Sequence, residues 1–277
     1  MASTVDTVHY FHAEANSLGG FIEQPIKKVI PAQSSASLPA VGGHVTNSTE
    51  AFNFEGIVSC SGAYTRVSGR LLETDGTPTT LVTSVVEGFN LLEIVTADRI
   101  VAQVSIEHPV DGGDPVFTFT GSRFEGLKIG GQDASLTLNS SLLGSGAGTG
   151  PITWSLFQKT GKLQAAKLVK SAQSGGAAYQ WVVDRYGWMA PAKAPTKAPG
   201  SILCSLVDGV APSVPGKSFG HVMDIPGFGK VIFGEVMAFP ASVHLSMIRA
   251  ELGSPTSGGL NMASVSGNGG TVPPSMQ

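Results

Sequence analysis

The chain has 277 residues, of which 42% are hydrophobic and only 13% are charged, and its formal net charge is −3. This length suffices for one large β domain or two small ones. The charge balance excludes a basic surface of the kind that binds nucleic acid, and no apolar run is long enough to cross a bilayer as a helix. An average soluble domain has about 25% charged residues. The low charge therefore predicts a surface covered by other copies of the chain, although a soluble surface rich in Gly, Ser and Thr would have the same composition.

Residues 1–50 combine a terminal segment with an extended arm. Residues 4–18 are compatible with a short helix that Asp6 caps, or with a strand. Residues 21–50 contain three prolines and no lasting periodicity, so we expect this arm to be mobile or held by a second subunit. The first twenty residues lack the basic and apolar regions of a secretory signal peptide, which predicts a cytoplasmic protein or export by a non-classical route.

Residues 51–252 are predicted to form one all-β core, and the strongest signal lies in Leu81–His108. One side of a period-2 pattern there consists of Ile100, Ala102, Val104, Ile106 and His108, and the other side of Val101, Gln103, Ser105 and Glu107. Such alternation is typical of strands with one dry face and one wetter face. We predict two or three consecutive strands in this stretch, with turns at Glu87–Gly88 and Ala97–Asp98.

Turn signals continue on both sides of Leu81–His108, at the spacing typical of all-β folds. They predict an antiparallel β-sandwich or a barrel-like sheet with one short helix, Lys162–Ala172, and extended terminal arms. Strands are predicted around Trp154 and over Tyr179–Arg185. The Pro/Ala-rich segment 190–200 is expected to be a long loop within the core domain, or else a boundary between two domains. The Gly/Ser-rich tail, residues 253–277, is expected to be flexible, with one edge strand at Leu260–Val265.

The densest group of polar side chains lies in the sequence EHPVDGGDP. Its carboxylates, Glu107, Asp111 and Asp114, are candidate ligands for Ca²⁺, whose oxygen ligands tolerate irregular loops. A plain hairpin loop has the same composition. His108 beside Asp111 would suit acid–base chemistry, but the sequence positions no nucleophile.

Four aromatic residues flank the predicted helix and, together with His108, are the candidate ligand-binding residues: Trp154, Tyr179, Trp181 and Trp188. Aromatic side chains on a sheet face can stack on sugars or contact another protein. Packing in the core and across strands explains the same residues without a ligand.

Histidines and cysteines elsewhere give weaker signals. His221 lies three residues before Asp224, which leaves a hydrolase or lyase with a His/Asp site as one alternative. Motifs for a nucleophile elbow, a phosphate loop and a dinucleotide site are absent from the sequence. Cys60 and Cys204 lie in apolar, strand-like runs, so we expect two buried free thiols, with a disulfide between them as the alternative.

Three segments follow one another in a characteristic order: LLEIVTADRIVAQVSIEH, TFTGSRFEGLKIGG and GKVIFGEVMAFPASVHLSMIRAELGS. They contain Thr96-Ala97-Asp98, the glycine-flanked hairpin Gly126–Gly131, and His244 in a late strand. This pattern resembles predicted bacterial cell-surface proteins of the choice-of-anchor kind. The resemblance implies a β fold and a non-enzymatic role.

These observations favour a structural β protein that self-assembles into a homo-oligomer, shell or filament. The first alternative is a module that binds glycan or a small apolar ligand. The second is the hydrolase or lyase named above.

Overall fold

The computed structural model describes residues 8–144, 151–190, 200–211 and 213–272. Two antiparallel sheets dominate it. Sheet A consists of β1 Val8–Gln24, β2 Lys28–Gln33, β3 Ala36–Ser37, β15 Ile202–Ser205, β17 Lys217–Phe219, β18 Val222–Ile225, β19 Gly229–Ala238, β20 Ser242–Leu252 and β21 Ser257–Val272. Sheet B consists of β4 Gly43–Thr49, β5 Phe52–Phe54, β6 Val58–Cys60, β7 Gly62–Leu71, β8 Pro78–Leu91, β9 Val95–Glu107, β10 Val116–Thr118, β11 Arg123–Glu125, β12 Lys128–Ile129 and β13 Gln132–Asp133. A short separate pair joins β14 Leu136–Leu138 to β16 Val207–Val210.

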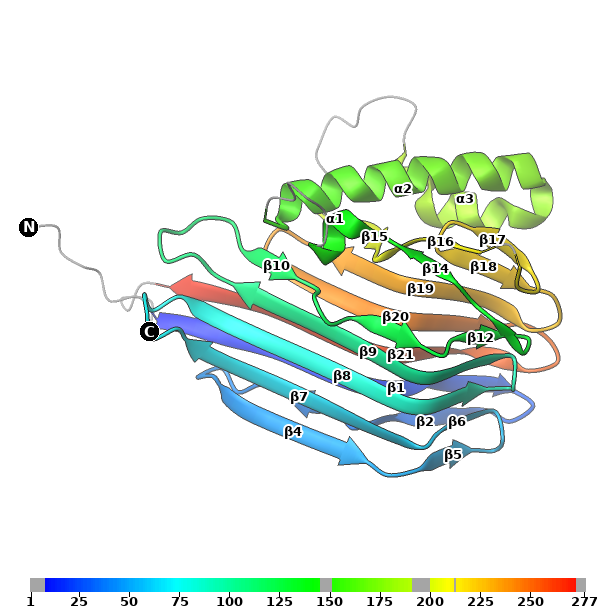
Figure 1. Cartoon of the computed structure of the whole chain (residues 1–277), viewed down its shortest axis with the longest axis horizontal. Coiled ribbons are helices and arrows are strands. Elements are labelled where there is room, and N and C mark those ends of the chain that lie inside the picture. Colours follow the sequence, from blue (N-terminus) through cyan, green and yellow to red (C-terminus); the bar gives the residue numbers. More distant parts are fainter. Residues whose placement is uncertain (1–7, 145–150, 191–199, 212, 273–277) are drawn as a thin grey trace, which may run out of the picture.

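The two sheets stack as a sandwich, with β8 and β9 of sheet B drawn in front of β1 and β21 of sheet A in Figure 1. The order in sheet A is β17-β18-β19-β20-β21-β1-β2, with β15 on β19 and β3 on β1. In sheet B the path β13-β12-β9-β8-β6-β5 is extended by β10 and β11 on β9, by β7 on β8, and by β4 on β7. Neither sheet closes on itself, so the predicted mainly β, antiparallel architecture is confirmed as an open sandwich.

The hairpin of β8 and β9 forms the centre of sheet B. Ile100, Ala102, Val104 and Ile106 are fully buried, which confirms the dry face that the sequence predicts. The predicted turns at Glu87–Gly88 and Ala97–Asp98 are wrong, because both lie inside strands. Gly88 has a φ of 55°, which lets β8 bulge without ending. The actual turn uses Leu92 and Glu93, with φ values of 54° and 58°.

The long strands of sheet A reverse their side-chain alternation along one line across the sheet. In β1, Ala13 and Ala15 point into the sandwich, but beyond Ser17 the inward residues are Leu18 and Ile22. The same reversal occurs at Ala263 in β21 and at Gly234 in β19, whose φ values are 47° and 60°. Because neighbouring strands reverse together, the sheet keeps one dry inner face along its whole length.

Three helices complete the described structure: α1 Ser140–Leu143, α2 Trp154–Gly175 and α3 Gln180–Tyr186, with 3₁₀ turns at Ala177–Tyr179 and Gly187–Met189. Helix α2 protects the edge of sheet A at β15. The side-chain amide of Gln164 donates to the carbonyl of Ser205 (3.0 Å) and accepts from its N–H (2.8 Å). The Gln164 side chain therefore forms hydrogen bonds that a further strand would otherwise form. This blocks the exposed edge from pairing with another chain. No described helix is long and apolar enough to span a membrane.

Some local predictions fail around these helices. The predicted helix Lys162–Ala172 is part of α2, but the strands predicted around Trp154 and over Tyr179–Arg185 are helical. The β-propensity of the aromatic and branched residues there is overruled by packing, because Val182 and Tyr186, four residues apart, bury the same helix face. The loop predicted at residues 190–200 falls largely outside the described residues.

The segments predicted as arm and tail are instead parts of the sheets. The ambiguous residues 4–18 become the first half of β1 from Val8 onwards, and residues 21–50 contain the end of β1 and all of β2, β3 and β4. The tail segment Ser257–Val272 forms β21, which lies between β20 and β1 rather than at an edge. Its glycines permit close sheet packing, since a Cβ on Gly267 would lie 2.6 Å from a side-chain atom of Ile106.

Candidate functional site

The outer face of sheet A is covered by protein on one side only. Helix α3 lies over β19, where Arg185 donates two hydrogen bonds to the buried carboxylate of Glu235 at 2.7 and 2.8 Å. There is no such cover over the outward side chains of Met237 and Phe239, of the first half of β20, of the second half of β21, of β1 as far as Phe21, and of Val29 in β2. We call this region the bare face; it comprises Tyr10, His12, Glu14, Asn16, Phe21, Val29, Met237, Phe239, Ser242, His244, Ser246, Ser264, Ser266 and Asn268.

The bare face combines exposed apolar side chains with neutral polar ones. The exposed fractions are 47% for Phe21, 73% for Val29, 36% for Met237, 37% for Phe239 and 40% for Tyr10. Glu14 is the one carboxylate in the set. Isolated exposed apolar residues are normal on a soluble protein, but several on one sheet face indicate a contact surface.

A row of hydrogen bonds crosses the middle of the bare face. Nε2 of His244 lies 3.2 Å from Oγ of Ser246, which in turn lies 2.9 Å from Oγ of Ser264. Burial lowers the pKa of His244, so its imidazole is neutral near pH 7. Two shallow hollows of about 290 and 170 Å³ flank this row and share His244. The centre of the face is therefore polar, uncharged and slightly concave.

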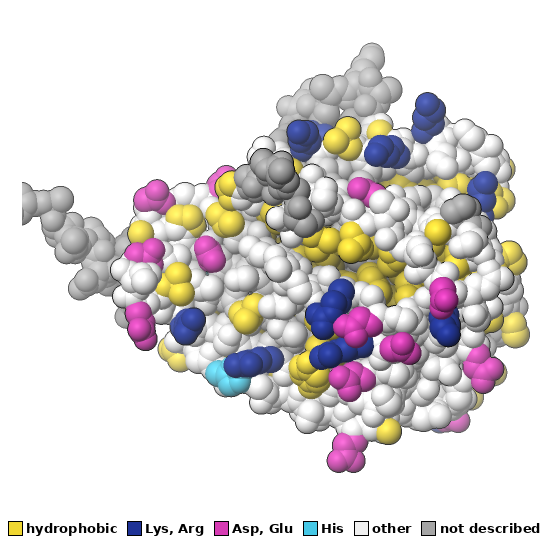
Figure 2. Space-filling view, viewed as in Figure 1, with side chains coloured by type: hydrophobic (Ala, Val, Ile, Leu, Met, Phe, Trp, Pro, Cys, Tyr) yellow, Lys and Arg dark blue, Asp and Glu magenta, His cyan; other side chains and the backbone are white. Residues whose placement is uncertain are grey.

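The outer face of sheet B has a different chemistry. Figure 2, which views the molecule from this side, shows Lys, Arg, Asp and Glu side chains spread over it. Arg99 pairs with Glu87 at 3.7 Å, and Arg123 pairs with Glu125 at 2.6 Å. These pairs are at least partly exposed, so this face is suited to water.

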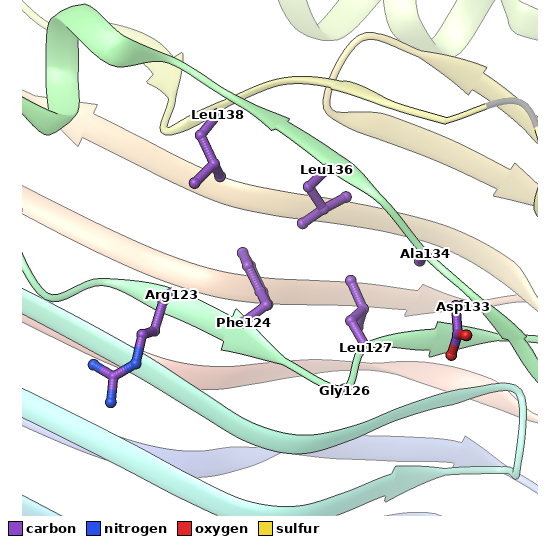
Figure 3. A pocket seen from close by; sticks show the side chains of 8 residues that line it. All are labelled: Arg123, Phe124, Gly126, Leu127, Asp133, Ala134, Leu136 and Leu138. Atoms are coloured by element: carbon purple, nitrogen blue, oxygen red, sulfur yellow. The ribbon is translucent and has the colours of Figure 1, made fainter. Parts of the chain in front are cut away.

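An apolar groove separates the small β14 strand from sheet B. It has a volume of about 310 Å³ and is lined by Arg123, Phe124, Gly126, Leu127, Asp133, Ala134, Leu136 and Leu138. Figure 3 shows Leu136 and Leu138 on one side of the groove and Phe124 and Leu127 on the other. Leu138 is 45% exposed. The volume is at the lower end of the range for small-molecule sites.

The candidate aromatic residues do not form one surface patch. Trp154 is the first residue of α2, about 30 Å of helix away from Tyr179. Tyr179 packs on Phe219, with ring centroids 4.6 Å apart. The ring of Trp181 lies 4.4 Å from Nζ of Lys230. Trp188, 47% exposed, donates its indole N–H to the carbonyl of Arg185. Tyr179, Trp181 and Trp188 thus each have a partner within the chain.

The predicted calcium ligands lie at the end of β9 and in the following loop. Glu107 and Asp114 are exposed, and Asp111 accepts a hydrogen bond from the N–H of Gly113 at 3.0 Å, as in an ordinary turn. Within the described ranges, no group of three or more His, Cys, Asp or Glu side chains is arranged to hold a metal ion. A Ca²⁺ site at this loop stays a prediction.

The candidate histidines lie apart from each other. His108 directly follows β9 and packs beside His9 of β1, whereas His221 is buried beside Tyr186, with Nε2 3.3 Å from the hydroxyl oxygen. Asp224 pairs in register with Lys217 across β17 and β18. Cys60 and Cys204 are buried and free, as predicted, and burial raises the pKa of both thiols.

Sequence reasoning misses the polar network around Glu235. The network joins Arg185 and Tyr186 of α3 to His221, in the turn before β18, and to Glu235 of β19. The sequence singles out His221 but pairs it with Asp224, and the further signal that could have found the network is a carboxylate within the apolar run of β19.

Comparison with known proteins gives a family without an assigned activity. The model of a family described as a domain of unknown function, DUF8256, matches residues 9–239. The chain belongs to this family. The matched range includes all of sheet B and ends just after β19, so β20 and β21 follow it. No curated protein and no solved structure matches the chain.

Proposed function

We propose that this chain is a non-enzymatic structural β protein that associates with further copies of itself through the bare face of sheet A. The observation that carries this proposal is the contrast between that neutral, partly apolar face and the charged outer face of sheet B. Few charges on the face mean little repulsion between two copies. Neutral Ser, Asn and His side chains can donate and accept hydrogen bonds, so the same patch suits both partners of a two-fold contact.

The size of the bare face supports this role. Four strands about 4.8 Å apart and some ten residues long span a flat area on the order of 650 Å² before the relief of the side chains is counted. A stable interface covers about 800 Å² on each partner. The face is thus comparable in size with one partner's share of a specific contact. A second contact elsewhere would be needed to extend a dimer into a shell or filament.

Sedimentation velocity of the purified chain over a wide range of concentrations tests self-association. We expect the weight-average sedimentation coefficient to rise with concentration towards a dimer or a larger assembly. A single species with the mass of one chain at every concentration would contradict the proposal.

The groove between β11 and β14 favours a second candidate function, the binding of a small apolar ligand. The aliphatic and aromatic side chains that line it face one another across a solvent-open slot, with Arg123 and Asp133 at its margins (Figure 3). Nile red fluorescence is a direct probe. We expect Leu136→Asp to abolish the signal and Leu163→Asp, at a 56% exposed position of α2, to leave it unchanged. Equal signals from both variants would reject the groove as the binding site.

A further inference from the structure

Two histidines converge at the end of the sandwich where β1, β9 and β21 meet. The ring centroids of His9 and His108 lie 4.7 Å apart, with the rings tilted by 52°. A Cβ on Gly269 would lie 2.6 Å from Nε2 of His9 and 2.8 Å from Nε2 of His108. Both Nε2 atoms therefore border one small space, which stays open because residue 269 has no side chain.

His108 is built into this site rather than attached to its surface. The residue is 8% exposed, and its backbone N–H donates to the carbonyl of Pro78 at 3.0 Å. Its Nε2 is buried and has no hydrogen-bond partner among the described residues. Leaving such a buried atom without a partner destabilises the folded chain. A ligand in the space beside Gly269 would remove that destabilisation.

The chemistry of both residues suits a metal, because an imidazole nitrogen that carries no proton has the lone pair that a metal requires.

We propose that His9 and His108 bind a divalent transition-metal cation such as Zn²⁺ between their Nε2 atoms. Imidazole nitrogen is a preferred ligand of Zn²⁺ and its neighbours in the first transition row, at about 2.0–2.1 Å. Ca²⁺ and Mg²⁺ require oxygen ligands, which these two residues do not provide. Two protein ligands leave coordination positions for water or for an exogenous ligand.

The site is separate from the proposed contact surface. His9 and Gly269 belong to strands that also contribute to the bare face. The side chain of His9, and the position that a Cβ on Gly269 would take, lie on the inner side of sheet A. Metal binding and self-association can therefore each fail without the other.

Isothermal titration of the full chain with zinc chloride tests the proposal. We expect one ion per chain, and a loss of affinity of at least about tenfold in His9→Gln and in His108→Phe. The matched controls are His12→Gln, whose side chain is 59% exposed, and His44→Gln, also at an exposed position. Both controls should bind as the unmodified chain does.

Gly269→Ala gives an independent variant, because its methyl group fills the space without removing a ligand. The visible absorption of bound Co²⁺ reports coordination directly, so a change in stability alone does not imitate the result. We expect the band in the unmodified chain and its loss in His9→Gln and Gly269→Ala; if His108→Phe does not fold, these two variants decide. Absence of Zn²⁺ binding by the unmodified chain, binding that survives in His9→Gln, or binding that is lost in the His12 or His44 control would overturn the proposal.

Discussion

The two outer faces of the sandwich are built from similar long antiparallel strands but differ in what covers them. The outer face of sheet B carries charged side chains in exposed pairs, such as Arg123 with Glu125. The outer face of sheet A carries charge mainly where α3 lies over it, and there the carboxylate of Glu235 is only 5% exposed. The bare face has Glu14 as its one carboxylate, among neutral polar and apolar side chains. The difference supports the proposal that the outer face of sheet B meets water and the bare face meets a second copy of the chain.

Helix α3 shows how the chain covers part of sheet A with its own residues. Ile232, on the outer side of β19, is 1% exposed because the helical layer lies over it. Phe21 and Met237 occupy outward positions on the same sheet without such cover. A second copy of the chain placed on the bare face would continue the layer that α3 begins.

Removal of the buried charge under α3 should have the largest effect on stability. Glu235→Gln removes the carboxylate to which Nη2 of Arg185 donates both hydrogen bonds, and breaking such a buried pair costs about 4 kcal/mol. Urea denaturation of each variant gives the free energy of unfolding. Glu125→Gln is the control on sheet B, where an exposed pair contributes less than about 1 kcal/mol. Equal losses of unfolding free energy in the two variants would contradict the account, because the covered charge would then matter no more than the exposed one.

The covered region should also respond to acid. Burial lowers the pKa of His221 to about 4, against 6.5 for the free side chain, and His221 is enclosed near Tyr186, Glu235, Arg185 and Asp208. The unfolded chain therefore binds one more proton than the folded chain between about pH 4 and 6.5, so stability falls as the pH falls through that range, by on the order of 3 kcal/mol.

Unfolding free energies measured from pH 7 to pH 4 check this effect. In His221→Gln the slope of the unfolding free energy against pH should be smaller, by up to the amount that corresponds to one bound proton. The same slope in the variant and the unmodified chain would show that His221 is not the group responsible.

A smaller loss is expected where α2 protects the edge of sheet A. Gln164→Leu removes the side-chain partners of the N–H and C=O of Ser205. The exposed carboxylate of Asp208 also loses one donor but keeps the amide of Asn139. We expect a loss of about 2 kcal/mol in the free energy of unfolding. Gln173→Leu, at an exposed position of the same helix, should change it by less than about 0.5 kcal/mol.

The sequence predicts the centre of the sandwich well and its ends poorly. The alternation in Ile100–His108 reflects burial directly, because one side of the strand packs against the other sheet. The prediction of a flexible tail is wrong because β21 is rich in Gly, Ser and Asn, which have low intrinsic β-propensity. Its pairing with β1 and β20 on both sides supplies the hydrogen bonds that propensity does not.

The candidate sites depend on contacts that are distant in the chain. The polar neighbours of His108 mark it as a candidate in the sequence. Its neighbour in space, His9, lies near the start of β1, far from it in the chain, so the sequence does not connect the two. The bare face could not be predicted either, because the reversals at Ser17, Gly234 and Ala263 change which residues point outward. A simple period-2 pattern carried through these points would place Phe21 on the inner face.

The most direct test of the account compares one aromatic residue on each outer face. Phe21→Glu places a charge on the bare face, and Tyr64→Glu places one on the outer face of sheet B, at positions that are 47% and 37% exposed. Neither change should alter the free energy of unfolding by more than about 0.5 kcal/mol. We predict by sedimentation velocity that Phe21→Glu weakens self-association at least about tenfold, since a charge buried at an interface without a partner costs more than 1.4 kcal/mol. Tyr64→Glu should associate as the unmodified chain does. Unchanged association of Phe21→Glu, or equal weakening in both variants, would contradict the assignment of the bare face.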